Sequence, residues 1–521
     1  MSELHWTEVD HVPVVWADAG APLRAGLLFR AGYADETLAT FGRTHLIEHL
    51  AFSAMNDEFH RHNGTVDATT TGFFTAGLAG DVSDFLAKVC DALSSLPAER
   101  LEDEKRVLAA ENAGRSRDVY SQLLMWRYGA AGHGLAAMPE LGLRTATLEL
   151  LQEHVAERFT SGNAVLWLSG PPPDGLRLRL PKGPKLPLPA LAPIQHTFPG
   201  WFVDDACGGV AAGATVPRVC ASTIFADLAL ARLRKRLRVE HAVSYAPAVF
   251  YVPLDAGTAH MVLYADSDHD RRAELCEAFG EVFAALREVE ASEVEAARAR
   301  IGERWTGALA SPPAERIASE AQRAALDWIF GKPFEPEDSL HAKHAAATRE
   351  DVAAVACRMQ ETTIFALPPE AEPRPWCGER IPCSTVPVVD GRKLLHLEAP
   401  TERARLVYGP DGVSVLLADG SHRTVRYSHL AAALKYEDGC VGLIGTDAAM
   451  VMVEPTIWQD GRDACHRILQ RVPPHLVIAY PARPARAIPQ AENRIGMRQH
   501  RIYLVWTWIA VILLLYFLLG S

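Results

Sequence analysis

Apolar and polar positions along the chain follow strand and helix periods in turn. Two apolar runs within residues 12–30, separated by Gly20 and a turn at Pro22, predict a pair of strands. A block at 63–74, in which turn residues lead into Thr and Phe, predicts a further strand. Apolar residues at helical spacing predict helices over 82–93 and 99–113. The first part of the chain is therefore expected to be an α+β unit with an antiparallel sheet plus helices.

The same order of elements recurs, more weakly, after a stiff proline-rich linker at residues 181–189. The pattern predicts strands at 208–216 and 259–264, and helices at 223–237, 271–286 and 292–305. We therefore predict a duplicated fold, with a first unit over residues 1–180 and a second over 195–367.

The last third of the chain has a different pattern. A second linker at 368–394 leads to short strands that are broken by Asp-Gly and Pro-Asp-Gly turns, and a helix at 461–472 is expected to close the domain. This predicts a small β domain over residues 395–478. Several strands capped by a helix look like a pleckstrin-homology (PH) or GRAM-type sandwich.

A tether rich in Pro and Arg, residues 479–501, precedes an uncharged apolar run at 502–519. As a helix this run spans about 27 Å, close to the roughly 30 Å hydrocarbon core of a bilayer. Arginines precede it, and positive flanks stay cytoplasmic. We predict a single-pass transmembrane helix that tail-anchors cytoplasmic domains, with a bacterial plasma membrane as the expected location. The alternative is a buried helix of a soluble domain.

Net charge and cysteine content indicate which partners the protein can bind and in which cellular compartment it is expected. A net charge of −12 argues against a nucleic-acid partner. The nine cysteines include no CxxC pair, which indicates reduced, cytosolic thiols. The N-terminus lacks a basic region followed by an apolar run, so no secretion signal is expected.

The candidate chemistry lies in the predicted helix at residues 42–52. His45 and His49 are four positions apart, so a helix places their imidazoles one above the other, where they can share one metal ion. Glu48 lies beside them and can take a proton from a metal-bound water. A chance match to this short motif is the alternative, and the flanking residues decide between the two.

Gly32, Glu36, Gly42 and Phe52 extend the match, and the stretch resembles the pitrilysin/insulinase (M16) metallopeptidases. The resemblance covers residues 1 to about 367. It implies two M16-type α/β units with zinc in the first only, since the second has no His-x-x-acid-His motif. It also implies Zn²⁺ as the cofactor and peptides as substrates.

The resemblance further implies the third ligand. Glu104 and Glu111 are seven apart on one helix, where the family carries a supporting acid and then a metal-binding acid. Glu111 is thus expected to bind zinc and Glu104 to support the site. The alternative is a pair of solvated helical carboxylates. Glu111 follows His49 by somewhat fewer positions than the family usually shows.

A segment of the second unit resembles the family's substrate-binding pair. Arg238 and Tyr245 are seven apart, as in the family's Leu-Arg-Glu-x-x-Gly-Leu-Ala-Tyr segment, where the two side chains are thought to hold the substrate backbone. The alternative is an ordinary basic helix face, because Arg232, Arg234, Lys235 and Arg236 surround Arg238.

Together these features predict a membrane-anchored, zinc-dependent endopeptidase or oligopeptidase that hydrolyses peptide bonds with metal-activated water. M16 chambers are built from four such units and this chain supplies two, so a homodimer, or a heterodimer with another M16-type chain, is expected. The competing hypothesis is a non-catalytic M16-like subunit, structural or peptide-binding, in a membrane complex. A third hypothesis makes the β domain and tail the functional part, with the peptidase fold used to bind a partner.

Overall fold

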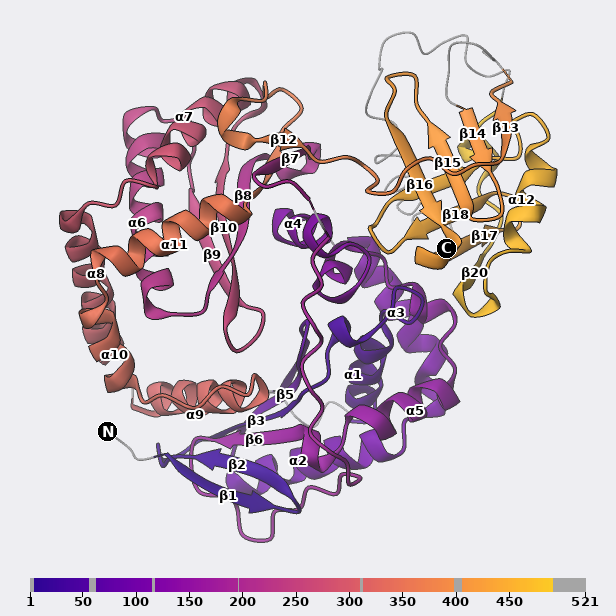
Figure 1. The fold of residues 1–521 in the computed structure, drawn as a ribbon. Helices are drawn as coiled ribbons and strands as arrows, with labels where there is room; N and C mark the ends of the chain where they lie inside the picture. Colours follow the sequence, from indigo (N-terminus) through magenta and orange to yellow (C-terminus); the bar gives the residue numbers. More distant parts are fainter. Residues whose placement is uncertain are drawn as a thin grey trace.

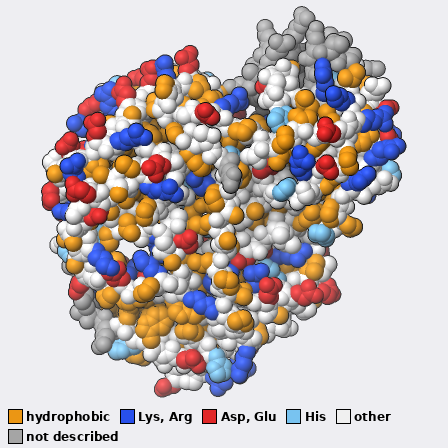
Figure 2. Space-filling view, in the orientation of Figure 1, with side chains coloured by type: hydrophobic (Ala, Val, Ile, Leu, Met, Phe, Trp, Pro, Cys, Tyr) orange, Lys and Arg blue, Asp and Glu red, His pale blue; other side chains and the backbone are white. Residues whose placement is uncertain are grey.

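The structure is a computed structural model that describes residues 4–55, 62–114, 118–194, 196–309, 313–397 and 405–490. Figure 1 shows two sheet-and-helix units, unit 1 in indigo and purple and unit 2 in colours from magenta to orange, and a smaller β domain in orange and yellow at the upper right. In the space-filling view of the same face, the β domain forms a separate lobe beside the larger body (Figure 2).

Unit 1 is built on a six-stranded sheet in the order β1-β2-β6-β3-β5-β4. Its strands are β1 (His5–Val9), β2 (Val12–Trp16), β3 (Leu23–Phe29), β4 (His62–Val66), β5 (Thr71–Gly77) and β6 (Ala164–Leu168). The expected pairing of the two strands in 12–30 is wrong, because β6 lies between β2 and β3. β2 and β6 run parallel, so the sheet is mixed rather than purely antiparallel.

The helices of unit 1 are α1 (Arg43–Ser53), α2 (Ala79–Ser94), α3 (Leu101–Gly114), α4 (Val119–Tyr128) and α5 (Leu148–Arg158). The helices expected at 42–52, 82–93 and 99–113 are present as α1, α2 and α3, and two helices that were not predicted, α4 and α5, follow them. Helices α1, α2, α3 and α5 contribute to one core with the sheet, in which Leu46, Ile47 and Leu50 of α1 are fully buried. Because these residues anchor one side of α1, its histidines are left on the other side.

Unit 2 repeats this plan, with a sheet in the order β12-β7-β11-β8-β10-β9. Its strands are β7 (Gly200–Val203), β8 (Gly209–Pro217), β9 (Ala248–Pro253), β10 (Thr258–Asp266), β11 (Ile364–Leu367) and β12 (Glu379–Arg380). Its helices are α6 (Cys220–Leu233), α7 (Arg272–Ala285), α8 (Ala291–Leu309), α9 (Pro313–Ile329), α10 (Glu337–Ala346) and α11 (Arg349–Thr362). Strand β12 lies within the predicted linker 368–394 and pairs parallel with β7.

One helix of each unit packs against the other unit. Helix α4 of unit 1 packs on unit 2, where Leu123 lies in one cluster with Val262 and Ile364. Helix α9 of unit 2 covers the unit 1 sheet, with Ala321 and Ala325 against strand residues of β2, β3 and β6. This exchange joins the two units through apolar contacts on both sheets, and α9 is visible below β9 at the lower left of Figure 1.

The β domain, here residues 392–480, consists of two four-stranded sheets and one helix. The sheets are β13-β14-β15-β16 and β19-β18-β17-β20, made of β13 (Arg392–Leu395), β14 (Arg405–Tyr408), β15 (Gly412–Leu416), β16 (His422–Arg426), β17 (Leu430–Tyr436), β18 (Val441–Gly445), β19 (Met450–Val453) and β20 (Val477–Tyr480). Helix α12 (Gly461–Leu469) does not close the domain as expected, because β20 follows it and pairs parallel with β17. The PH- or GRAM-type resemblance stays a prediction.

Among the described residues, no helix is both long and apolar enough to cross a membrane. The predicted transmembrane helix at 502–519, and the tether from residue 491 onward, lie outside the described residues.

Candidate metal centre

The start of α1 is fixed by a buried carboxylate. Glu36 accepts hydrogen bonds from the backbone N–H of Gly42 (2.9 Å) and of Thr44 (2.7 Å), which a helix start otherwise leaves without partners. Gly42 has φ of 103°, a conformation that glycine adopts without strain. Burial raises the pKa of Glu36 to about 7, although these hydrogen bonds act in the opposite direction.

The two histidines of α1 and one acid of α3 converge. The Nε2 atoms of His45 and His49 lie 4.0 and 3.7 Å from Oε2 of Glu111. One potential ligand atom from each of the three residues lies within 4.8 Å of the other two. Two imidazoles and one carboxylate are a known zinc ligand set that leaves a fourth position open.

The other ring nitrogen of each histidine faces a buried carboxylate. His49 Nδ1 lies 3.3 Å from Oε2 of Glu104, and His45 Nδ1 lies 3.0 Å from Oε1 of Glu140. Such carboxylates fix the ring orientation and make Nε2 the nitrogen that faces a metal. Glu104 was predicted from the sequence and Glu140 was not.

Both carboxylates are held in turn by other side chains. Glu104 accepts a hydrogen bond from Nη2 of Arg100 (2.8 Å), and Glu140 accepts one from Nδ2 of Asn112 (2.7 Å). Asn112 follows Glu111 directly on α3. Glu140 therefore contacts the two helices that carry the candidate ligands.

Glu48 lies beside His49, on the same helix as the two candidate histidine ligands. Its side chain is buried, and Oε2 is 3.8 Å from Nε2 of His49. Burial raises the pKa of Glu48 to about 7, with His45 lowering it and Glu111 and Glu104 raising it further. A carboxylate whose pKa lies near neutrality is suited to accept and return a proton.

The charge balance of the group also fits a divalent cation. For His45, burial lowers the pKa, but the hydrogen bond and charge of Glu140 raise it on balance. For His49, burial and the nearby His45 lower the pKa below its usual value. Four carboxylates surround two imidazoles here, and a bound cation would compensate this excess of negative charge.

A cavity of about 290 Å³ opens beside His45. Val66 of the edge strand β4 and Asp118 and Ser121 at the start of α4 contribute to its walls. The candidate metal centre therefore borders a space that can admit part of a ligand.

The structure does not bring Arg238 and Tyr245 to this centre. Arg238 lies in a π-helical turn after α6, and its guanidinium is 5.4 Å from the Tyr245 ring, which is 80% exposed. No interaction among the described residues joins either side chain to His45, His49 or Glu111. Figure 1 shows α6 and α1 in different units.

Comparison with models of protein families gives no match, and no curated protein matches the sequence. Solved structures do match. A protease from Helicobacter pylori is 14% identical with a TM-score of 0.58, over 72% of this chain and 100% of that one. A peptidase M16 inactive domain from Pseudomonas fluorescens is 16% identical with a TM-score of 0.58, over 71% and 99%. A chain of complex III2 from Candida albicans is 14% identical with a TM-score of 0.56, over 70% and 95%.

These similarities define the class of fold. The chain has the fold of M16-like peptidase domains, and the solved structures with this fold include a protease and a domain described as inactive. At 14–16% identity these structures share the fold of this chain, and the activity depends on the side chains of the metal centre.

Proposed function

We propose that this chain is a zinc-dependent endopeptidase or oligopeptidase of M16 type. His45, His49 and Glu111 would hold the zinc ion. The observation that carries the proposal is the convergence of both Nε2 atoms on Glu111, with Glu48 beside them. A buried carboxylate without such neighbours would only lower the stability of the fold, because burying a charge costs free energy.

Bound zinc would polarise a water molecule and lower its pKa. The carboxylate of Glu48 would accept a proton from the attacking water and later deliver it to the leaving amine, as general base and then general acid. Glu104 and Glu140 keep the two imidazoles oriented throughout, since each accepts from an Nδ1–H. Peptides would enter beside β4, next to the cavity at His45.

The proposal extends to assembly. Arg238 and Tyr245 belong to unit 2, whereas the residues of the metal centre belong to unit 1, and Tyr245 is largely exposed. In a homodimer, or a heterodimer with another M16-type chain, such a pair would face the metal centre of the other chain and hold the substrate backbone there. Arg238→Ala and Tyr245→Phe should then raise KM for peptides while zinc content stays unchanged. Cleavage with normal KM in both variants would exclude this role.

We also propose that the 502–519 run anchors the chain in a membrane with the described domains on the cytoplasmic side. Deletion of residues 491–521 should then release a chain that no longer sediments with washed membranes and still cleaves small peptides. Sedimentation of the truncated chain would contradict the anchor. Digestion of the N-terminal domains by protease outside intact cells would contradict the orientation.

The second candidate function is a non-catalytic subunit, structural or peptide-binding, in a membrane complex. It is supported by the similarity to a domain described as inactive and to a chain of complex III2. The retention of Glu48 next to both histidines favours catalysis instead. Metal analysis of residues 1–490, combined with cleavage of unstructured peptides, tests the choice: about one zinc per chain and chelator-sensitive cleavage support the peptidase, and zinc without cleavage supports the alternative.

A further inference from the structure

The β domain packs against the segments that frame the metal centre. Its second sheet forms one apolar cluster with unit 1, which includes Ile444 and Tyr480 of the β domain and Leu38, Phe41, Ala130 and Leu141 of unit 1. Leu38 to Phe41 lead directly into Gly42 at the start of α1. The domain thus covers both the entry to α1 and the stretch around Glu140.

The β domain contacts the turn that follows Glu140. Glu140 immediately precedes the 3-10 turn η4 (Leu141–Arg144). Leu141 is buried in the shared cluster, and the Arg144 guanidinium lies 3.9 Å from the centre of the Tyr480 ring on β20. A guanidinium over an aromatic ring is attracted by the negative charge of the ring face. The turn that carries Glu140 is therefore held on its outer side by the β domain.

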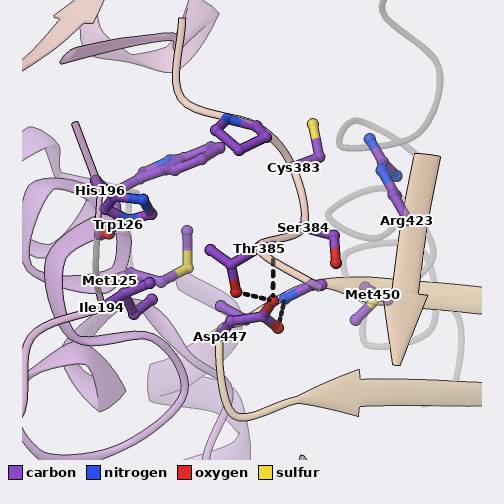
Figure 3. A pocket seen from close by; sticks show the side chains of 13 residues that line it. Met125, Trp126, Ile194, His196, Cys383, Ser384, Thr385, Arg423, Asp447 and Met450 are labelled. Carbon is purple, nitrogen blue, oxygen red and sulfur yellow. Dashed lines mark hydrogen bonds between the residues drawn. The ribbon is translucent and has the colours of Figure 1, made fainter. Parts of the chain in front are cut away.

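A second attachment lies at the end of α4. The backbone N–H of Ala130 donates to the carbonyl of Thr446 in the β18–β19 turn at 2.9 Å. Asp447 of the same turn accepts from the backbone N–H and the hydroxyl of Thr385 in the linker, at 3.3 and 3.2 Å. Figure 3 shows this junction, where Asp447 and Thr385 face Met125 and other side chains of unit 1 across a small pocket. Two separate attachments hold the domain in one orientation.

The Glu140 side chain lies between His45 and Asn112 at the metal centre. This side chain is only 4% exposed, with one oxygen toward His45 Nδ1 and the other toward Asn112. A Cβ added at Gly42 would come within 2.7 Å of Glu140 Cβ, so the start of α1 and this side chain are in close contact. A displacement of η4 would therefore move the carboxylate that orients His45.

We propose that Glu140 is a positioning residue for His45 and that the β domain, docked through Tyr480 and Arg144, keeps it in place. The affinity of the centre for zinc then depends on how the β domain is docked, so a partner bound to this domain can change metal binding from outside the peptidase units. The inference rests on the proposed function, because it needs a metal at His45, His49 and Glu111.

Double-mutant cycles in the full chain test this coupling. The zinc dissociation constant is measured by competition with a chromophoric chelator for the wild type, for Glu140→Gln, Tyr480→Ala and Arg144→Ala, and for the double variants that combine Glu140→Gln with each of the other two. Arg144→Ala breaks the same contact from unit 1 and leaves the β domain core intact. Tyr427→Ala is the matched control, because Tyr427 packs on the other core of the β domain. Thermal unfolding checks that each variant is folded.

Loss of a carboxylate that supports a ligand typically weakens binding about 10–100-fold, and we expect this for Glu140→Gln. Tyr480→Ala and Arg144→Ala should each weaken zinc binding by several-fold in the wild-type background and by less than about twofold when Glu140 is already Gln, because coupled residues are not additive. Tyr427→Ala should leave zinc binding unchanged.

Three results would overturn the inference: additive effects in the double variants, unchanged zinc affinity in both contact variants, or an equal loss in Tyr427→Ala. A wild-type chain that binds no zinc would overturn the proposed function together with this inference. The two failures are therefore distinguishable by the wild-type measurement alone.

Discussion

The carboxylate of Glu48 lies in the space that a side chain at position 64 would need. A Cβ built on Gly64 would come 1.7 Å from Oε1 of Glu48 and 2.3 Å from the ring of Phe52. Gly64 lies in the edge strand β4, which thereby approaches α1 closely enough to confine the proposed base. A residue that makes no bond with the metal ligands thus determines where Glu48 can lie.

Gly64→Ala should therefore displace Glu48 while His45, His49 and Glu111 stay in place. General-base catalysis typically contributes about 10²–10⁴-fold, so peptide cleavage should fall within that range while zinc content stays close to that of the wild type. Gly80→Ala is the control, since nothing lies within 4 Å of a Cβ at that helical position. Gly64→Ala with full turnover would show that Glu48 can work from another position.

The two acids of α3 should differ in their effect on metal binding. Glu111 faces the Nε2 atoms of both histidines, whereas Glu104 contacts just one of the two histidines, His49, at its Nδ1. Glu111→Gln removes a ligand and should release zinc at chelator concentrations that Glu104→Gln still withstands, with the latter weakened about 10–100-fold. Zinc retention is measured by competition titration. The opposite order would mean that Glu104 is the ligand.

Stability should fall in acid because of a histidine at the contact between the units. His260 on β10 is fully buried, packs against the Tyr120 ring of α4, and neither of its ring nitrogens has a hydrogen-bond partner among the described residues. Burial, followed by the charges of Arg127 and His133, lowers its pKa well below 6.5. Since the unfolded chain binds a proton near pH 6.5 and the folded chain does not, this histidine costs stability as the pH falls below 6.5 and none above it.

His260→Phe should remove the loss of stability that His260 causes below pH 6.5. With a chelator present throughout, the free energy of unfolding of the wild type should fall more steeply between pH 6.5 and 5.5 than that of the variant, by up to about 1.4 kcal/mol per pH unit. Urea unfolding at several pH values measures the two slopes, and His475→Phe in an exposed turn serves as the control. Equal slopes in wild type and His260→Phe would show that His260 gains a proton while buried.

Local patterns predicted three helices of the first unit close to where they lie: α1 from its His-x-x-Glu-His motif, and α2 and α3 from the residues at 82–93 and 99–113. The block at 63–74 was expected to be one strand that follows turn residues, whereas the structure forms two strands there, β4 and β5, because the turn residues Asn63 and Gly64 lie within β4. The order of the strands in the sheet could not be predicted from local sequence patterns. The mistaken pairing of residues 12–30 arose because β6 enters the sheet from about 140 positions further along the chain, and a turn at Pro22 gives no sign of it.

In the candidate site, too, residues within one helix could be predicted from the sequence, whereas residues brought together by tertiary contacts could not. Helical spacing predicted that His45, Glu48 and His49 lie together on one helix, and the M16 resemblance, not spacing, implied that Glu111 joins them with Glu104 in support. Glu140 lies in an irregular segment 95 positions from His45, and its role depends on the contact between that segment and α1. Its neighbour Pro139 and the glycines around it indicate a turn and nothing more. The β domain's place against this segment is likewise a tertiary contact without a local signal.

The central claim is that Glu48 performs peptide hydrolysis at a zinc ion held by His45, His49 and Glu111. The most direct measurement is the cleavage of unstructured peptides, followed by mass spectrometry, with wild type and Glu48→Gln brought to the same zinc content. We expect the wild type to cleave and Glu48→Gln to lose essentially all turnover while keeping its zinc, because an amide cannot accept the proton. Equal cleavage by both, or no cleavage by either at full zinc content, would contradict the account.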